Sequence, residues 1–180
     1  MSKRQNGNKC EMMVALVGIA DSDTATIIYM LQKIFEYVYQ IQKKDKDDNV
    51  IEIEEEGSSM CIGFTSLYDA CDEKPENLDK EERYDRYKEA FNKLLKERKC
   101  HFIFCDSPTK GKTCDFVYSK LKEANTGLVV KRTMIENNTD CNSEKAAINF
   151  IDAYKLLVRS GLDQYIREEI IQILKRENGE

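Results

Sequence analysis

The chain has 180 residues, a length typical of one domain with a substantial hydrophobic core. Its net charge is −5 and its lysines and arginines are scattered, which argues against nucleic acid as the main partner. No apolar run approaches the length of a spanning helix, and the polar N-terminus lacks the apolar stretch of a signal peptide. We therefore expect a cytoplasmic protein with no membrane partner.

Seven cysteines and a single histidine, His101, raise the question of disulfides or zinc. No two cysteines have CxxC spacing, so a zinc site would need thiolates from distant positions. Cys61, Cys100 and Cys105 lie in apolar runs, where a thiol packs as a small hydrophobic side chain. We expect reduced, structural cysteines, a structural His101 and no metal site.

Continuous apolar runs alternate with helical periodicity along the chain. The run MVALVGIA at 13–20 predicts a central parallel strand that is buried on both faces. Apolar residues at spacings of three and four from Thr24 onward predict an amphipathic helix that ends in the charged run 43–49. Alternating apolar and acidic residues at 50–57 predict a strand near the sheet edge, and 58–77 fits either a short strand or an insertion.

The remaining pattern predicts a helix at 78–99, a buried strand at 100–106, a helix at 111–125, a core strand at 127–135, a loop at 137–142 and closing helices at 143–161 and 162–177. Strands that alternate with helices indicate an α/β fold, with an open, mainly parallel sheet and helices on both faces. We expect a polar tail at 1–12 and one domain at 13–177. Ligands of such sheets bind at the carboxyl ends of strands, here near Gly18–Asp23 and Asp106–Lys110.

The segment GIADSDTA at 18–25 has the length and position of a phosphate-binding P-loop, GxxxxGK[ST]. Asp23, Thr24 and Ala25 replace its second glycine, its lysine and its hydroxyl residue. The amides and the lysine of a P-loop neutralise phosphates. Asp21 and Asp23 would instead repel them, and each close contact between like charges costs on the order of a few kcal/mol. We expect ATP and magnesium to bind weakly or not at all, unless a metal held by the aspartates offsets this charge.

Other interpretations of these loops remain open. Gly111-Lys112-Thr113 follows a strand and opens a helix, but Asp106 replaces the first glycine of the motif, which favours Lys110 and Lys112 as surface charges. Asp21-Ser22-Asp23 matches only part of the DxD motif of haloacid-dehalogenase-like phosphatases. Asp106 either orients magnesium and accepts a proton or caps a turn, and Lys155 either reaches a phosphate or lies at the surface.

With its elements in this order, the chain from near residue 12 to its end resembles the kinase domain of 6-phosphofructo-2-kinase/fructose-2,6-bisphosphatase. MVALVGIADSDTA stands where that family has a GLPARGKT-like loop. HFIFCDSPTK occupies the position of the family's FDATNTT-like motif. NFIDAYK, with Tyr165 beyond it, occupies the position of an NIVQVK-like segment that is followed by a tyrosine. The resemblance implies a P-loop kinase-like fold, ATP as the nucleotide and fructose 6-phosphate as the acceptor.

By position, the resemblance implies a role for particular residues. Asp106 would be the catalytic acid near magnesium and the acceptor hydroxyl. Thr109, Lys155 and Tyr165 would contact the sugar phosphate. The nucleotide would contact Gly18, Ile19, Ala20, Asp21, Ser22, Asp23, Thr24, Asn149 and Lys155.

The departures from the family concern chemistry more than fold. The loop lysine and the magnesium-binding hydroxyl are absent, and the acidic EEEGSS stands where arginines are expected. Phosphoryl transfer depends on positioned positive charge. We therefore expect a degenerate kinase-like domain, a pseudoenzyme that binds a nucleotide, a sugar phosphate or a protein. The alternatives are an active sugar-phosphate kinase that uses Lys110, Lys112 or Lys155, and a longin-like trafficking adaptor, which requires an antiparallel sheet.

Overall fold

The computed structural model describes residues 10–19, 23–37, 49–55, 58–67, 78–132 and 142–164. The predicted loop at 137–142 and the predicted helix at 162–177 lie largely outside these residues. Within them, no helix is long and apolar enough to cross a bilayer.

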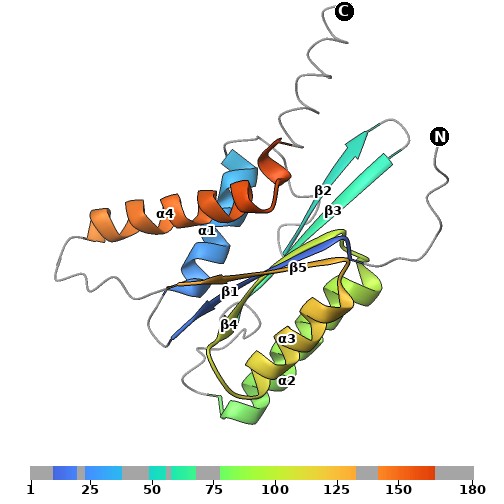
Figure 1. Cartoon of the computed structure of the whole chain (residues 1–180), viewed down its shortest axis with the longest axis vertical. Coiled ribbons are helices and arrows are strands. Elements are labelled where there is room, and N and C mark those ends of the chain that lie inside the picture. Colours follow the sequence, from blue (N-terminus) through green and yellow to red (C-terminus); the bar gives the residue numbers. More distant parts are fainter. Residues whose placement is uncertain are drawn as a thin grey trace, which may run out of the picture.

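A five-stranded sheet forms the centre of the described structure (Figure 1), in the order β2-β3-β4-β1-β5. Its strands are β1 (Met12–Gly18), β2 (Val50–Glu55), β3 (Ser58–Thr65), β4 (Phe102–Pro108) and β5 (Thr126–Lys131). Strands β3, β4, β1 and β5 are parallel, and only the β2–β3 pair is antiparallel. The predicted α/β fold with an open, mainly parallel sheet is confirmed, and the antiparallel sheet that a longin-like adaptor requires is not found.

Burial explains the place of each strand in the sheet. β1 is continuously apolar and lies between β4 and β5, as predicted. β2 lies at one edge, which the alternation of apolar and acidic residues also predicted. The prediction of a core strand at 127–135 was wrong in position, because β5 is the other edge strand and its side chains are exposed or half-buried.

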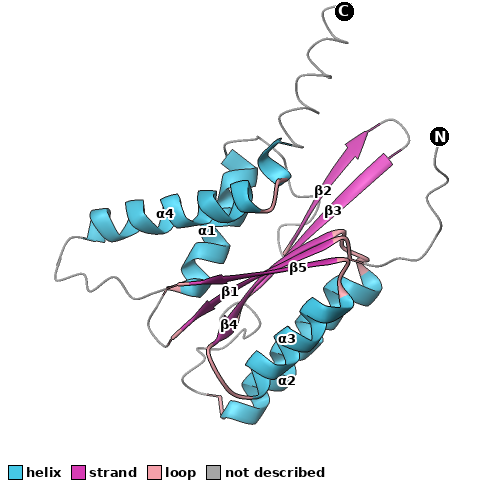
Figure 2. Cartoon of the chain, in the orientation of Figure 1, coloured by secondary structure: helices cyan, strands magenta, loops and turns pink. Residues whose placement is uncertain are grey.

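Helices cover both faces of the sheet (Figure 2). Helices α1 (Thr24–Tyr37) and α4 (Asn142–Arg159) lie on one side. On the other side lie α3 (Lys112–Glu123) and α2 (Lys80–Asn92), which continues into a π-helical turn, η2 (Lys93–Glu97). The side chain of Asp79 caps α2 by accepting hydrogen bonds from the N–H groups of Glu81 and Glu82. Gly161, with φ of 72°, follows α4 and supports the predicted break at Ser160-Gly161.

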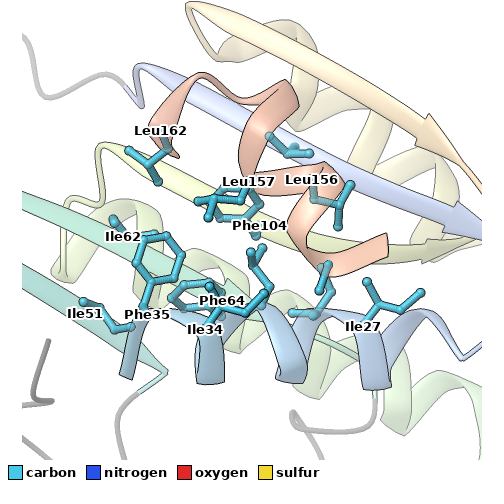
Figure 3. Packing of buried hydrophobic residues seen from close by; sticks show 14 of the residues in the cluster. Ile27, Ile34, Phe35, Ile51, Ile62, Phe64, Phe104, Leu156, Leu157 and Leu162 are labelled. Atoms are coloured by element: carbon cyan, nitrogen blue, oxygen red, sulfur yellow. The ribbon is translucent and has the colours of Figure 1, made fainter. Parts of the chain in front are cut away.

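Alternate side chains of β1 serve two separate cores, as expected for a strand buried on both faces. Val14 and Leu16 pack with α1 and α4, whereas Met13, Ala15 and Val17 pack with α2 and α3. Figure 3 shows the first core, in which Ile27, Ile34 and Phe35 of α1 and Leu156 and Leu157 of α4 surround Phe64 and Phe104. The rings of Phe64 and Phe104 stack at 5.7 Å between centroids. This packing holds β1, β3 and β4 against α1 and α4.

The second core contains most of the described cysteines. Cys10, Cys61, Cys100 and Cys105 belong to it, and Cys114 is also buried. These five thiols are buried, so the prediction that the cysteines pack as small hydrophobic side chains is confirmed for the described part of the chain. Burial raises the pKa of the Cys10 thiol to about 12, which keeps it neutral at physiological pH.

Candidate ligand-binding site

Two turns lie side by side at the carboxyl edge of the sheet. We call residues 18–24, between β1 and α1, the first turn, and residues 108–112, between β4 and α3, the second turn. Gly18 and Pro108 are paired in register where the two parallel strands end, so both turns leave the sheet at the same level. This edge is where parallel α/β sheets bind their ligands.

Asp23, in the first turn, has partners on other elements of the fold. Asp23 lies in the left-handed region, with φ of 55°, and its Oδ2 is 2.8 Å from Nζ of Lys145. The Asn149 amide donates a weaker bond to the same oxygen, at 3.4 Å, and its own Oδ1 accepts a 2.7 Å bond from Nη2 of Arg132. The predicted nucleotide residues Asp23 and Asn149 therefore lie together, in a network that ties α4 and the end of β5 to the start of α1.

Asp106 also has structural partners. Its carboxylate is buried, with a relative exposure of 3%, at the point where β4 lies beside β1. It accepts a 2.9 Å bond from the Leu67 N–H and a 3.2 Å bond from Oγ1 of Thr24, while its backbone carbonyl accepts a 2.7 Å bond from the Tyr87 hydroxyl. Complete burial and the nearby Asp106 and Cys105 raise the pKa of Tyr87. These bonds match the turn-capping alternative for Asp106.

Described groups of the first turn do not fit ATP with magnesium. A P-loop supplies a lysine to the phosphates and a hydroxyl to the metal. Here the hydroxyl of Thr24 donates to Asp106, and the cation that reaches Asp23, Lys145, is paired with it. Ala20, Asp21 and Ser22 lie outside the described residues, as does Tyr165.

The second turn borders a large cavity, which we call the second-turn pocket. Its volume is about 930 Å³, within the range that holds drug-sized ligands. Helices α2 and α3 both begin at this pocket. Its lining residues are Gly18, Ile19, Leu67, Lys80, Glu81, Arg83, Tyr84, Pro108, Thr109, Lys110, Gly111, Lys112 and Thr113.

The pocket has a cationic rim. Among the described residues, four lysine or arginine side chains and one carboxylate, that of Glu81, line it. Glu81 pairs with Lys112 at 2.5 Å and raises the pKa of Lys112 through this hydrogen bond. Lys80 and Lys110 make no hydrogen bond or ion pair with any residue that the structure describes. The rim therefore offers positive charge that the described chain does not neutralise.

Backbone donors add to this charge. Gly111, with φ of 98°, precedes α3 in a conformation that favours glycine, and no side chain of a described residue caps the helix. The first N–H groups of α3 consequently remain available at the pocket, together with the positive end of the helix dipole. On the other walls, Ile19, Leu67, Tyr84 and Pro108 provide apolar surface. This combination suits a ligand that has an anionic group and a less polar body.

The pocket brings together only part of the predicted site. Gly18, Ile19 and Thr109 line it, whereas Asp23, Thr24, Asp106 and Asn149 do not. Lys155 lies elsewhere, paired with Asp152 at 3.1 Å. Lys80, Arg83 and Tyr84 were missed as site residues. In sequence, the two charged residues belong to the exposed face of a helix and Tyr84 to its apolar side, and nothing there indicates that α2 begins beside the second turn.

Comparison with known proteins finds no relative of this chain. The chain matches no family model, no curated protein and no solved structure. Among the residues that the structure describes, no three His, Cys, Asp or Glu side chains lie close enough to share a metal ion. The resemblance to 6-phosphofructo-2-kinase therefore stays a prediction from the sequence.

Proposed function

We propose that this domain binds a phosphorylated small molecule, a nucleotide or a sugar phosphate, in the second-turn pocket, and that it transfers no phosphoryl group. The proposal keeps the kinase-like pseudoenzyme that the sequence suggests. It moves the ligand from the first turn, where a P-loop would hold it, to the second turn.

The observation that carries the proposal is the convergence of unpaired positive charge and uncapped amides on one cavity. Lys80 and Lys110 come from different elements, and the N-terminus of α3 adds oriented N–H donors. A phosphate group accepts several such hydrogen bonds at once, and charge-assisted bonds of this kind are about twice as strong as neutral ones. The cavity volume leaves room for a nucleoside or a sugar beside the phosphate.

The partners of Asp106 support the non-catalytic part of the proposal. A general base must reach the acceptor hydroxyl, but the Asp106 carboxylate is buried and accepts hydrogen bonds from Leu67 and Thr24. Lys112 is the described lysine that best matches a P-loop lysine in sequence, and it is paired with Glu81. Neither group supports the alternative of an active kinase.

Binding can be tested by titrating isotope-labelled protein with AMP, with ATP and magnesium, and with fructose 6-phosphate, while amide chemical shifts are recorded. Adenosine and fructose are the matched ligands without phosphate. We expect shifts at Gly111, Lys112 and Thr113 only with the phosphorylated ligands. Lys110→Gln should weaken this binding up to about fivefold, and Lys80→Gln with Lys110→Gln about tenfold, since each exposed charge contributes up to about 1 kcal/mol.

Lys96→Gln is the matched control, because Lys96 is exposed on η2 and does not line this pocket. An equal loss of affinity in Lys96→Gln would mean that only net charge attracts the ligand, and would overturn the site. Robust formation of ADP from ATP and fructose 6-phosphate would overturn the non-catalytic part of the proposal.

A further inference from the structure

A second, smaller cavity lies on the other face of the sheet, between the end of β5 and α4. We call it the α4 pocket. Its volume is about 280 Å³, and it is lined by Leu16, Val130, Lys131, Arg132, Asp152, Lys155, Leu156 and Arg159. Leu16 and Leu156 belong to the core beneath α1 and α4, which places the cavity on this face of the sheet. None of its described lining residues also lines the second-turn pocket.

Positive charge dominates the α4 pocket. Four of its described lining residues are lysine or arginine, and the one carboxylate among them, that of Asp152, is paired with Lys155 at 3.1 Å. Lys131 and Arg159 are exposed, and they have no hydrogen bond or ion pair with the part of the chain that the structure describes. The net charge of the lining is therefore strongly positive although the whole chain is acidic.

Arg132 supplies the second, independent observation. Its Nη2 donates to Asn149, which fixes the direction of the guanidinium. Its Nη1 is buried and has no hydrogen-bond partner among the described residues. A buried guanidinium nitrogen without an acceptor is costly, so such a group is normally paired in the functional state. The missing partner must be an acceptor, because a guanidinium has donors only.

We propose that the α4 pocket binds a single phosphate group, either inorganic phosphate or the phosphate of a small phosphomonoester. Arg132 and Arg159 provide planar forks that match phosphate oxygens, and Lys131 adds a third cation. A phosphate dianion balances this excess of charge better than a carboxylate monoanion does. The smaller volume admits the phosphate with a short substituent but not a nucleotide. This inference does not rest on the proposed function, since the two pockets lie on opposite faces of the sheet.

The site can be tested by titrating isotope-labelled protein with inorganic phosphate and, separately, with glycerol 3-phosphate. We expect saturable shifts at the amides of Lys131, Arg132 and Arg159. Lys131→Gln and Arg159→Gln should each weaken binding about fivefold, because both remove a charged donor while their exposed positions leave the core intact. Thermal unfolding of each variant checks that the fold is retained.

Lys96→Gln is again the matched control, and it should leave the affinity of the α4 pocket unchanged. Tighter binding of glycerol 3-phosphate than of inorganic phosphate would identify a phosphomonoester as the ligand, and equal binding would identify the free anion. Shifts confined to Gly111, Lys112 and Thr113, or an equal loss of affinity in Lys96→Gln, would overturn the proposal. Lys110→Gln should weaken binding only in the second-turn pocket, which separates a failure here from a failure of the proposed function.

Discussion

The first and second turns occupy equivalent places in the fold and have opposite electrostatics. Both follow a buried parallel strand, and both lead into a helix at the carboxyl edge of the sheet. In the first turn, Asp23 is neutralised by Lys145, and Thr24 donates to the buried Asp106. In the second turn, Lys110 has no partner among the described residues and the following helix has no side-chain cap. We therefore expect phosphate to bind only at the turn whose positive charges are left unneutralised.

Among the variants that test this difference, Asp106→Ala should have the largest effect. The substitution removes the acceptor that the Leu67 N–H and the Thr24 hydroxyl share, at a buried position where water cannot easily replace it. We expect the free energy of unfolding to fall by about 2–3 kcal/mol, the range for loss of buried hydrogen bonds to a charged group. Urea unfolding followed by circular dichroism measures it.

Asp85→Ala is the matched control, because Asp85 is exposed on α2, and its effect should stay within about 0.5 kcal/mol. Unchanged or increased stability in Asp106→Ala would show that Asp106 is held at a cost to the fold, as catalytic groups often are. Such a result would contradict the structural role of Asp106 that distinguishes the first turn from the second.

A smaller effect is expected from Asp23→Asn, which is designed to make the first turn resemble the second. Asparagine also tolerates the positive φ at this position, so the backbone should be retained. The change removes the ion pair with Lys145, and we expect the free energy of unfolding to fall by up to about 1 kcal/mol. Lys145 then becomes available to an anion, and phosphate should shift the amide of Thr24.

Asp152→Asn provides the comparison for Asp23→Asn, since it also removes a carboxylate that pairs with a lysine of α4. Phosphate should not shift the Thr24 amide in that variant. The absence of any shift in Asp23→Asn would show that backbone geometry, and not charge alone, prevents anion binding at the first turn.

Periodicity predicted the fold well, because strand and helix patterns record burial directly. The apolar run of β1 and the acidic alternation of β2 placed a central and an edge strand correctly. The edge position of β5 was missed, since GLVV is as apolar as a central strand. That no further described strand pairs with β5 is a tertiary property that local sequence does not record. In the same way, sequence spacing cannot reveal that Lys80 and Lys110 line the same pocket. Local patterns predicted the carboxyl edge as the binding region, and tertiary packing decided which turn carries the charge.

The smallest predicted effect comes from Glu81→Gln, which would sharpen the comparison from the side of the second turn. Glu81 and Lys112 form an exposed ion pair at 2.5 Å, and such pairs contribute little to stability. We expect the free energy of unfolding to change by less than about 0.5 kcal/mol. Affinity for AMP should rise about two- to threefold, because Lys112 loses its competitor and the pocket loses the one carboxylate among its described lining residues. Glu97→Gln, on η2, controls for net charge. A fall in AMP affinity in Glu81→Gln would mean that Glu81 orients Lys112 toward the ligand instead of competing with it.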